Sequence, residues 1–408
     1  MVKTAALGVT VAPVIAGQVD KTGVGAGRLV YLDGIRGYLL TMMYLIHFQA
    51  MSQGFGTSFF LAALHHGNLL PVYDAEYLVP LSGFVSALAY SGVYRAGGLW
   101  AAQVTVIKRV RSLYIYQIVT GIIVIMLPLL FHTQFGIPKT TPLWQQLGDV
   151  LTLVYQPDNV QILVLFMAVM LFIPLAFRAL ERFGAMYFTA IIMVCWMIGP
   201  SGIDVDMSAW ITDHIFPWTQ YFQLSGFFNP FSWGSLFYAG FLGGWMYKTR
   251  PATVKIFDRR VMDRWLVASL AVCGFFSIGR AIDTILNLGS ATLFYPSRAM
   301  VSLQSFATIG ATCFIVFYLL VGKAADTSPS RMSTGLDAVL HFRWFVLLGQ
   351  NSLFIYSMHV VVLMAMTLWL SAMPRYPSQM LMLALFIAGY ATMLITSKLK
   401  RRYLPTLP

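Results

Sequence analysis

The stretch that decides the fold is Asp33-Gly34-Ile35-Arg36-Gly37-Tyr38-Leu39-Leu40-Thr41-Met42-Met43-Tyr44-Leu45-Ile46-His47, a polar motif that leads into a long apolar run. Arg36 and His47 are eleven residues apart, which at ~100° per residue is three helical turns with only ~20° left over. They therefore share one helix face, separated by roughly 16 Å along the axis. Asp33 lies on that face too, about 40° from His47. In a helix that spans a bilayer, His47 lies inside, where an ionisable side chain is costly and marks a functional candidate.

The composition assigns the chain to the membrane. Hydrophobic residues make up 58% of the 408 residues, charged residues 10%, and the mean hydropathy is +0.72, whereas an ordinary soluble domain has about 25% charged residues. The sequence predicts an all-α, polytopic integral membrane protein of about ten transmembrane helices, because each apolar segment is close to the ~20 residues that cross the hydrocarbon. The predicted spans are Arg36–Gln53, Tyr77–Tyr94, Leu113–Phe131, Val160–Phe177, Met186–Ile203, Phe231–Tyr247, Trp265–Ile282, Ser302–Val321, Phe345–Leu370 and Gln379–Thr396.

Lys and Arg residues predict the orientation, because cytoplasmic loops carry an excess of them. Alternate connections collect the basic residues, while the opposite connections hold little beyond Lys139, Arg298 and Arg375. Both termini are therefore predicted to be cytoplasmic. The net charge of +12 is a topology signal, and no nucleic-acid-binding motif accompanies it. The basic residues of the predicted inner side are Lys3, Lys21, Arg28, Arg95, Lys108, Arg109, Arg111, Arg178, Arg182, Lys248, Arg250, Lys255, Arg259, Arg260, Arg264, Lys323, Arg331, Arg343, Lys398, Lys400, Arg401 and Arg402.

The spans predict one membrane domain at residues 29–397, between a cytoplasmic tail at 1–28 and a basic cytoplasmic tail at 398–408. A cleaved signal peptide at Ala5–Gly17 is the alternative for the first tail. Pro13, the weak hydrophobicity of this stretch and the much better span that follows argue against it.

Two long outer connections, His132–Asn159 and Asp204–Asn229, are where an extracytoplasmic substrate would meet the protein. The three cysteines fall inside predicted spans without the spacing of metal ligands, so we expect apolar fillers and no metal site. These cysteines are Cys195, Cys273 and Cys313.

The motif Tyr31-Leu32-Asp33-Gly34-Ile35-Arg36-Gly37 with His47 following resembles the opening of the acyltransferase-3 superfamily, integral membrane enzymes with an Arg and a His in the first helix. Asp74-Ala75-Glu76-Tyr77-Leu78-Val79-Pro80-Leu81-Ser82-Gly83-Phe84 is similar to the OpgC branch of that superfamily. Two later segments continue the likeness in order. They are Asn229-Pro230-Phe231-Ser232-Trp233 with Leu236-Phe237-Tyr238-Ala239-Gly240, and Leu348-Gly349-Gln350-Asn351-Ser352-Leu353-Phe354-Ile355-Tyr356-Ser357-Met358-His359.

The resemblance implies succinylation of osmoregulated periplasmic glucans by a multi-pass enzyme of the bacterial inner membrane. It implies an acyl-coenzyme A co-substrate, with succinyl as the acyl group of this branch, and no bound cofactor. The acceptor it implies is a periplasmic glucan or another envelope polysaccharide, with a glucan synthase as a candidate partner. An acetyl donor stays open as the alternative.

One motif departs from the superfamily pattern. Arg-x-x-Arg usually enters the third span, whereas Lys108-Arg109-Val110-Arg111 has a Lys in the first place. Lys holds a phosphate as a point charge and not as a bidentate fork. Lys108 and Arg111 still share a helix face at three-residue spacing. Arg36, Lys108, Arg109 and Arg111 are therefore the predicted site for the phosphates of acyl-coenzyme A at the inner surface.

Acyl transfer to a sugar hydroxyl needs a general base near neutral pKa, and the unperturbed pKa of His, ~6.5, lies closest. His47 is the predicted base, and Asp33 is predicted to orient Arg36 one helical turn away. Asp74 and Glu76, expected at the outer mouth of the second span, are predicted to bind sugar hydroxyls or to tune His47. Three further candidates for the acceptor side are Ser82, Tyr356 and His359, of which the last two share a helix face.

Each assignment has a simpler competitor. A single intramembrane His is often a hydrogen-bonding residue between helices, and this holds for His47 and for His359. Basic residues at 108–111 would be found at the inner end of almost any span. Arg280 and Asp283 are most simply a structural ion pair, and Asn229 and Trp233 are as readily interfacial anchors as ligands.

Two other classes of protein compete with an acyltransferase. A transporter of a small solute or polysaccharide precursor also lines its path with polar residues, but the sequence has no inverted repeat and no acidic relay within the spans. A structural scaffold leaves Arg36 and His47 without a role.

Overall fold

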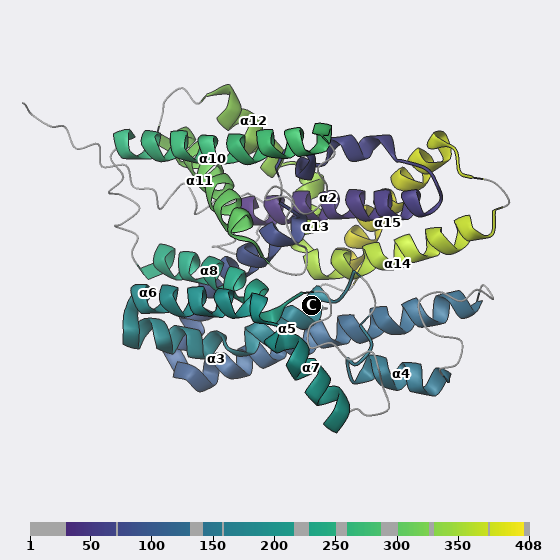
Figure 1. The fold of residues 1–408 in the computed structure, drawn as a ribbon, viewed down its shortest axis with the longest axis horizontal. Coiled ribbons are helices and arrows are strands. Elements are labelled where there is room, and N and C mark those ends of the chain that lie inside the picture. Colours follow the sequence, from purple (N-terminus) through teal and green to yellow (C-terminus); the bar gives the residue numbers. More distant parts are fainter. Residues whose placement is uncertain are drawn as a thin grey trace, which may run out of the picture.

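The computed structural model describes residues 30–70, 72–130, 142–156, 159–215, 228–249, 259–286, 301–325, 330–373 and 376–403. Within these ranges the regular structure is helical throughout, and many of the helices pack against one another along their lengths (Figure 1). The tail at 1–28, the last residues of the C-terminal tail, residues 132–141, 157–158 and 216–227 of the outer connections, and Lys139, Arg298 and Arg375 lie outside the described residues. The helices are α2 Val30–Gly54, α3 Asp74–Leu130, α4 Leu143–Leu151, α5 Ile162–Leu171, α6 Ile173–Ile198, α7 Ile203–His214, α8 Pro230–Thr249, α10 Arg259–Leu286, α11 Leu303–Ala325, α12 Arg331–Leu340, α13 Arg343–Gln350, α14 Ser352–Ser371 and α15 Gln379–Tyr403.

Among the described residues, six helices are long and apolar enough to cross a membrane. The protein is therefore a polytopic membrane protein, as predicted, while the count of ten spans stays a prediction. The α3 helix covers two predicted spans and is broken at Gly98, where φ is +68° and ψ is −162°. Residues with a side chain rarely adopt that backbone conformation, so the glycine allows the chain to change direction between the two predicted spans. The six candidates are Asp74–Leu129, Ile173–Ser201, Val261–Asp283, Leu303–Leu320, Ser352–Ser371 and Gln379–Tyr403.

Two predicted spans are wrong as continuous helices. The apolar run Phe345–Leu370 is interrupted at Asn351, whose side chain donates to the Leu347 carbonyl oxygen at 3.0 Å while its backbone leaves the helical region. Asn side chains compete with the helix for backbone groups, so α13 ends there and α14 begins anew. The run Val160–Phe177 is interrupted at Phe172, close before Pro174, which lacks the N–H that a continuing helix needs.

A re-entrant segment, residues 55–73, connects α2 to α3. It contains two short 3₁₀ helices, Phe60–Leu64 and His66–Asn68, and the Phe59 N–H donates to the Gln49 side chain at 2.6 Å. His66 reaches Tyr38, which lies sixteen residues, or about 24 Å, back along α2 from its end at Gly54. The chain therefore returns deep alongside α2 before α3 starts. Irregular backbone at such depth is tolerated where protein buries it.

Glycines hold α2 against α13. A Cβ at Gly37 would meet the Phe345 carbonyl oxygen at 1.8 Å, and one at Gly349 would meet the Asp33 carbonyl oxygen at 1.8 Å. Such contacts require glycine, because the two backbones touch without side chains between them. The glycines of the Asp33–Gly37 motif therefore position the first helix against the helix pair that carries His359.

Candidate active site

His47 of α2 faces His359 of α14. The Nδ1 atom of His47 lies 3.1 Å from the Nε2 atom of His359, and the two rings are stacked at 18° with centroids 5.3 Å apart. His359 is buried and His47 is half-buried. The tertiary fold thus joins two histidines that are 312 residues apart in sequence. A hydrogen-bonded imidazole pair can accept and return a proton, which is what general base chemistry requires.

A cavity of about 280 Å³ is lined by residues of α2, α3 and α14, and neither histidine of the pair is among them. Arg36 and Arg109 are its cationic lining residues, and its polar wall includes Ser82, Tyr90 and Ser352. We call it the Arg36 pocket. Leucine, isoleucine and phenylalanine side chains make up most of the remaining wall. An apolar cavity with a few convergent polar groups is the usual form of a small-molecule site.

Tyr356 joins the Arg36 pocket to the histidine pair. Its side chain lines the pocket, and its ring meets the His359 ring edge-on with centroids 5.2 Å apart. Its hydroxyl donates to the backbone carbonyl oxygen of Asn159. The Tyr356 ring therefore separates the cationic cavity from His359 and contacts both.

Asp33 lies one helical turn before Arg36 and close to it, as the spacing of the two residues predicts. Its Oδ1 atom is 3.9 Å from the Arg36 Nη1 atom, and the carboxylate is buried while the guanidinium is partly exposed. A buried carboxylate one turn before the arginine restricts the directions that the guanidinium can take.

The basic triplet of α3 is divided between two environments. Arg109 is half-buried and lines the Arg36 pocket, whereas Lys108 and Arg111 are exposed and do not line it. The reason is the helical period, since residues one position apart differ by ~100° in direction. The structure thus brings one member of the triplet to Arg36.

A further lysine lies near Arg109, although the sequence predicts it only as part of the basic cytoplasmic tail. Lys400 of α15 donates from Nζ to the Tyr116 hydroxyl at 3.3 Å, and its ammonium lies over the rings of Tyr116 and Phe354. The charge of Arg109 acts on it as well. Lys400 comes from the far end of the chain, so no local pattern could have indicated this contact.

Asp74 and Glu76 do not lie at an open outer mouth. Asp74 is 3% exposed and Glu76 is 0% exposed, and the Glu76 Oε2 atom accepts from the Tyr73 N–H at 2.7 Å. Their expected position assumed that α3 starts at the membrane surface. The re-entrant segment instead returns the chain to the depth of Tyr38 before α3 begins.

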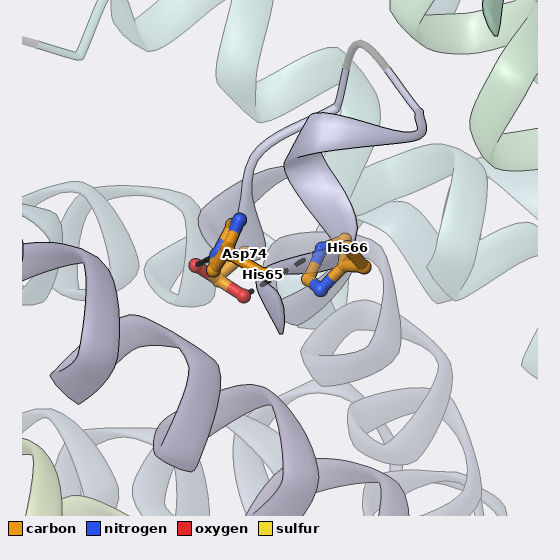
Figure 2. A group of neighbouring side chains, drawn as sticks. All are labelled: His65, His66 and Asp74. Atoms are coloured by element: carbon orange, nitrogen blue, oxygen red, sulfur yellow. Dashed lines mark hydrogen bonds and ion pairs between the residues drawn. The ribbon is translucent and has the colours of Figure 1, made fainter. Parts of the chain in front are cut away.

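Figure 2 shows Asp74 between His65 and His66. The Asp74 Oδ2 atom lies 2.9 Å from His65 Nε2, and its Oδ1 atom lies 3.6 Å from His66 Nε2. His65 Nδ1 accepts the Gly67 N–H at 2.9 Å, so the ring proton of neutral His65 is on Nε2 and is donated to Asp74. Burial lowers the pKa of His66, and the charge of Asp74 opposes this shift.

These three side chains are of types that bind metal ions, and their donor atoms lie within 4.8 Å of one another. A metal on His65 Nε2 would have to displace its proton, yet Nδ1 is already an acceptor and cannot take that proton while the Gly67 bond persists. The arrangement is that of a hydrogen-bonded cluster, which fixes the re-entrant segment to the start of α3.

The remaining candidates are structural in their contacts. The Asn229 side chain accepts from the N–H groups of Phe231 and Ser232 and donates to the Gly199 carbonyl oxygen. It therefore caps α8 and ties it to the end of α6. Trp233 is buried in the core.

Comparison with known families gives one match. The family model described as OpgC protein matches residues 28–404. No curated protein and no solved structure matches the chain.

Proposed function

The chain belongs to the OpgC family, and from this premise we propose that it moves a succinyl group from cytosolic succinyl-coenzyme A to a sugar hydroxyl of a periplasmic glucan across the bacterial inner membrane. Family membership itself implies a glucan succinyltransferase type of function. The observation that carries the rest of the proposal is the hydrogen bond between His47 and His359, which the Tyr356 ring separates from the Arg36 pocket.

We assign the tautomers of the pair from their neighbours. The His359 ring also hydrogen-bonds to backbone groups of Ile355 and Tyr356, in the preceding helical turn. Since Nε2 faces His47, Nδ1 is the atom that donates to those carbonyls, and Nε2 is then an acceptor. His47 Nδ1–H donates to it. The lone pair of His47 is thereby on Nε2, which is the nitrogen that we assign as the base.

The reaction then needs one proton transfer in each direction. His47 Nε2 takes the proton of the acceptor hydroxyl as its oxygen attacks the thioester carbonyl carbon. The C–O bond forms, the C–S bond breaks, and the imidazolium returns the proton to the leaving thiolate. His359 accepts the hydrogen bond of His47 Nδ1 throughout and so stabilises the imidazolium. Arg36, held by Asp33, and Arg109 bind the donor on the inner side of the thioester, and Lys108 and Arg111 attract it to the inner surface.

Reconstituted protein tests this function. Vesicles that contain the purified protein receive succinyl-coenzyme A on the side of the basic helix ends and glucan on the other, and mass spectrometry reads the glucan. We expect succinyl ester on the glucan, dependent on both substrates and their sidedness. Acetyl transfer in place of succinyl transfer would correct the donor. Glucan that crosses the membrane unmodified would identify a transporter.

A further inference from the structure

A second cavity lies at the basic end of the molecule. It has a volume of about 550 Å³ and is lined by Arg343, Trp344, Leu347, Lys398, Arg401 and Arg402. Four of these six residues are cations, and none of the six is acidic. We call it the inner basic pocket. Its walls come from the start of α13 and the end of α15.

The cations of this pocket are oriented by their neighbours. The Arg343 guanidinium and the Lys398 ammonium each lie 5.1 Å from the centre of the Trp344 ring, and the ring attracts both cations. Arg401 Nη1 donates to the Gln350 side chain at 3.4 Å. Like charges that converge on one concave site repel each other, so the site favours an anion of several charges.

The inner basic pocket and the Arg36 pocket are separate cavities whose walls include neighbouring segments of the chain. The chain passes from Trp344 along α13 to Ser352, which lines the Arg36 pocket. At the end of α15, Arg401 lines the inner basic pocket while the adjacent cation, Lys400, lies with Tyr116 near Arg109. Lys400 is therefore a cation between the inner basic pocket and Arg109, which lines the Arg36 pocket.

The Arg36 pocket alone is too small for an acyl-coenzyme A. Its volume of about 280 Å³ is just below the ~300–1,000 Å³ of sites for ordinary small ligands, and acyl-coenzyme A adds a nucleotide with several phosphates to a long thioester arm. On the basis of the proposed function, we propose that the inner basic pocket binds the nucleotide end of the donor through its phosphates. The pantetheine arm then extends past Lys400 into the Arg36 pocket.

The shared chemistry of the pocket is recognition of phosphate esters, which an anionic phospholipid headgroup also offers. The position of Lys400 near Arg109 favours coenzyme A, because a long ligand whose phosphates occupy the inner basic pocket can extend past this cation and a lipid headgroup does not need it. The experiment therefore contains one arm for each source.

Calorimetry on protein in phosphatidylcholine nanodiscs uses coenzyme A and pantetheine as probes. The variant Lys398→Ala/Arg402→Ala should bind coenzyme A at least ~10-fold more weakly than wild type, because charge-assisted hydrogen bonds to phosphate are lost. Its affinity for pantetheine should not change. The matched control Arg178→Ala/Arg182→Ala removes two exposed cations from α6 and should retain wild-type affinity for both probes. The single charge reversal Arg402→Glu, at an exposed position, should act in the same direction as the double variant.

Equal affinity of the Lys398→Ala/Arg402→Ala variant and wild type for coenzyme A overturns the proposal. In the lipid arm, nanodiscs of phosphatidylglycerol replace phosphatidylcholine, and bound lipid is counted by native mass spectrometry. Loss of phosphatidylglycerol from the variant, with its coenzyme A affinity intact, assigns the pocket to lipid.

Transfer assays with succinyl-coenzyme A and succinyl-pantetheine distinguish a failure of the proposed function from a failure of the pocket assignment. If wild type uses neither donor, the proposed function fails. If variant and wild type share one KM for succinyl-coenzyme A, only the pocket assignment fails.

Discussion

The molecule contains two groups of buried histidines that differ in what holds them. His65 has both ring nitrogens committed, one to the Gly67 N–H and one to the Asp74 carboxylate. His47 and His359 hydrogen-bond to each other, and in the tautomers proposed above the second nitrogen of His47, Nε2, takes the substrate proton. Both ring nitrogens of His65 are thus used within the protein, whereas one nitrogen of His47 is assigned to the reaction. The first group therefore suits a structural role and the second suits catalysis.

The largest effect is expected from the catalytic pair. His47→Ala should lower kcat for succinyl transfer by at least ~10²-fold, the lower end for loss of a general base, while the unfolding midpoint stays near that of wild type. His359→Gln should retain more activity than His359→Ala, because an amide oxygen can still accept from His47 Nδ1. Initial rates in vesicles and thermal unfolding in detergent measure both. Wild-type transfer by folded His47→Ala would end the proposed mechanism.

Substitutions in the cluster of His65, His66 and Asp74 should lower the free energy of unfolding and leave the rate of transfer unchanged. Asp74→Ala leaves the buried His65 Nε2–H without its acceptor, which should lower the free energy of unfolding by about 1–3 kcal/mol. Chemical unfolding monitored by tryptophan fluorescence measures it. Glu181→Ala, which removes the exposed acceptor of the Tyr94 hydroxyl, is the control and should change stability by under ~0.5 kcal/mol. If Asp74→Ala instead matched His47→Ala in rate with unaltered stability, the two groups would have exchanged roles.

Two tyrosines sharpen the same contrast. Tyr356→Phe removes the hydroxyl that donates to the Asn159 carbonyl oxygen and so loosens the ring that contacts His359, which should lower kcat by ~3- to 10-fold. Tyr38→Phe removes a hydroxyl 3.5 Å from His66 Nδ1, a distance too long for a strong hydrogen bond. Its kcat and stability should stay within ~2-fold and ~0.5 kcal/mol of wild type. Equal effects of the two substitutions would argue that His359 needs no support from Tyr356.

The smallest effect is a pH dependence of stability. The pKa of His66 is lowered by burial among Asp74, His65 and Tyr38, whereas the unfolded chain has a His pKa of ~6.5. The unfolded state therefore binds more protons below about pH 6.5, so stability is complete above that pH and decreases as pH falls. Unfolding midpoints at about pH 7.5 and pH 5.5 should differ less in His66→Gln than in wild type. An unchanged difference would mean that other groups cause the acid sensitivity.

Part of the site geometry follows from local sequence rules, and the two predictions that differ from the structure do so for one reason. The spacing of Asp33 and Arg36 predicted a contact that the structure contains at 3.9 Å. Asp74 and Glu76 were misplaced because the pattern of residues 55–73 does not indicate a segment that returns into the protein. The triplet at 108–111 was treated as one cluster, although only Arg109 faces the Arg36 pocket. In both cases the environment of a side chain depends on which segment packs against each face of α3, and the sequence of α3 alone does not contain this information.

The sequence by itself determined the membrane class, most helix positions, the motif order of the OpgC family, and the depth of His47 on its helix. These depend on hydrophobicity and on the 3.6-residue period, which are properties of short segments. Only the tertiary structure decided that His359 pairs with His47, that Lys400 lies near Arg109, and that the ends of α13 and α15 form a second basic cavity. The His47–His359 contact joins residues 312 positions apart, and the two helices that form the second basic cavity are separated in sequence by the whole of α14. No local pattern encodes which distant helix comes close enough to touch.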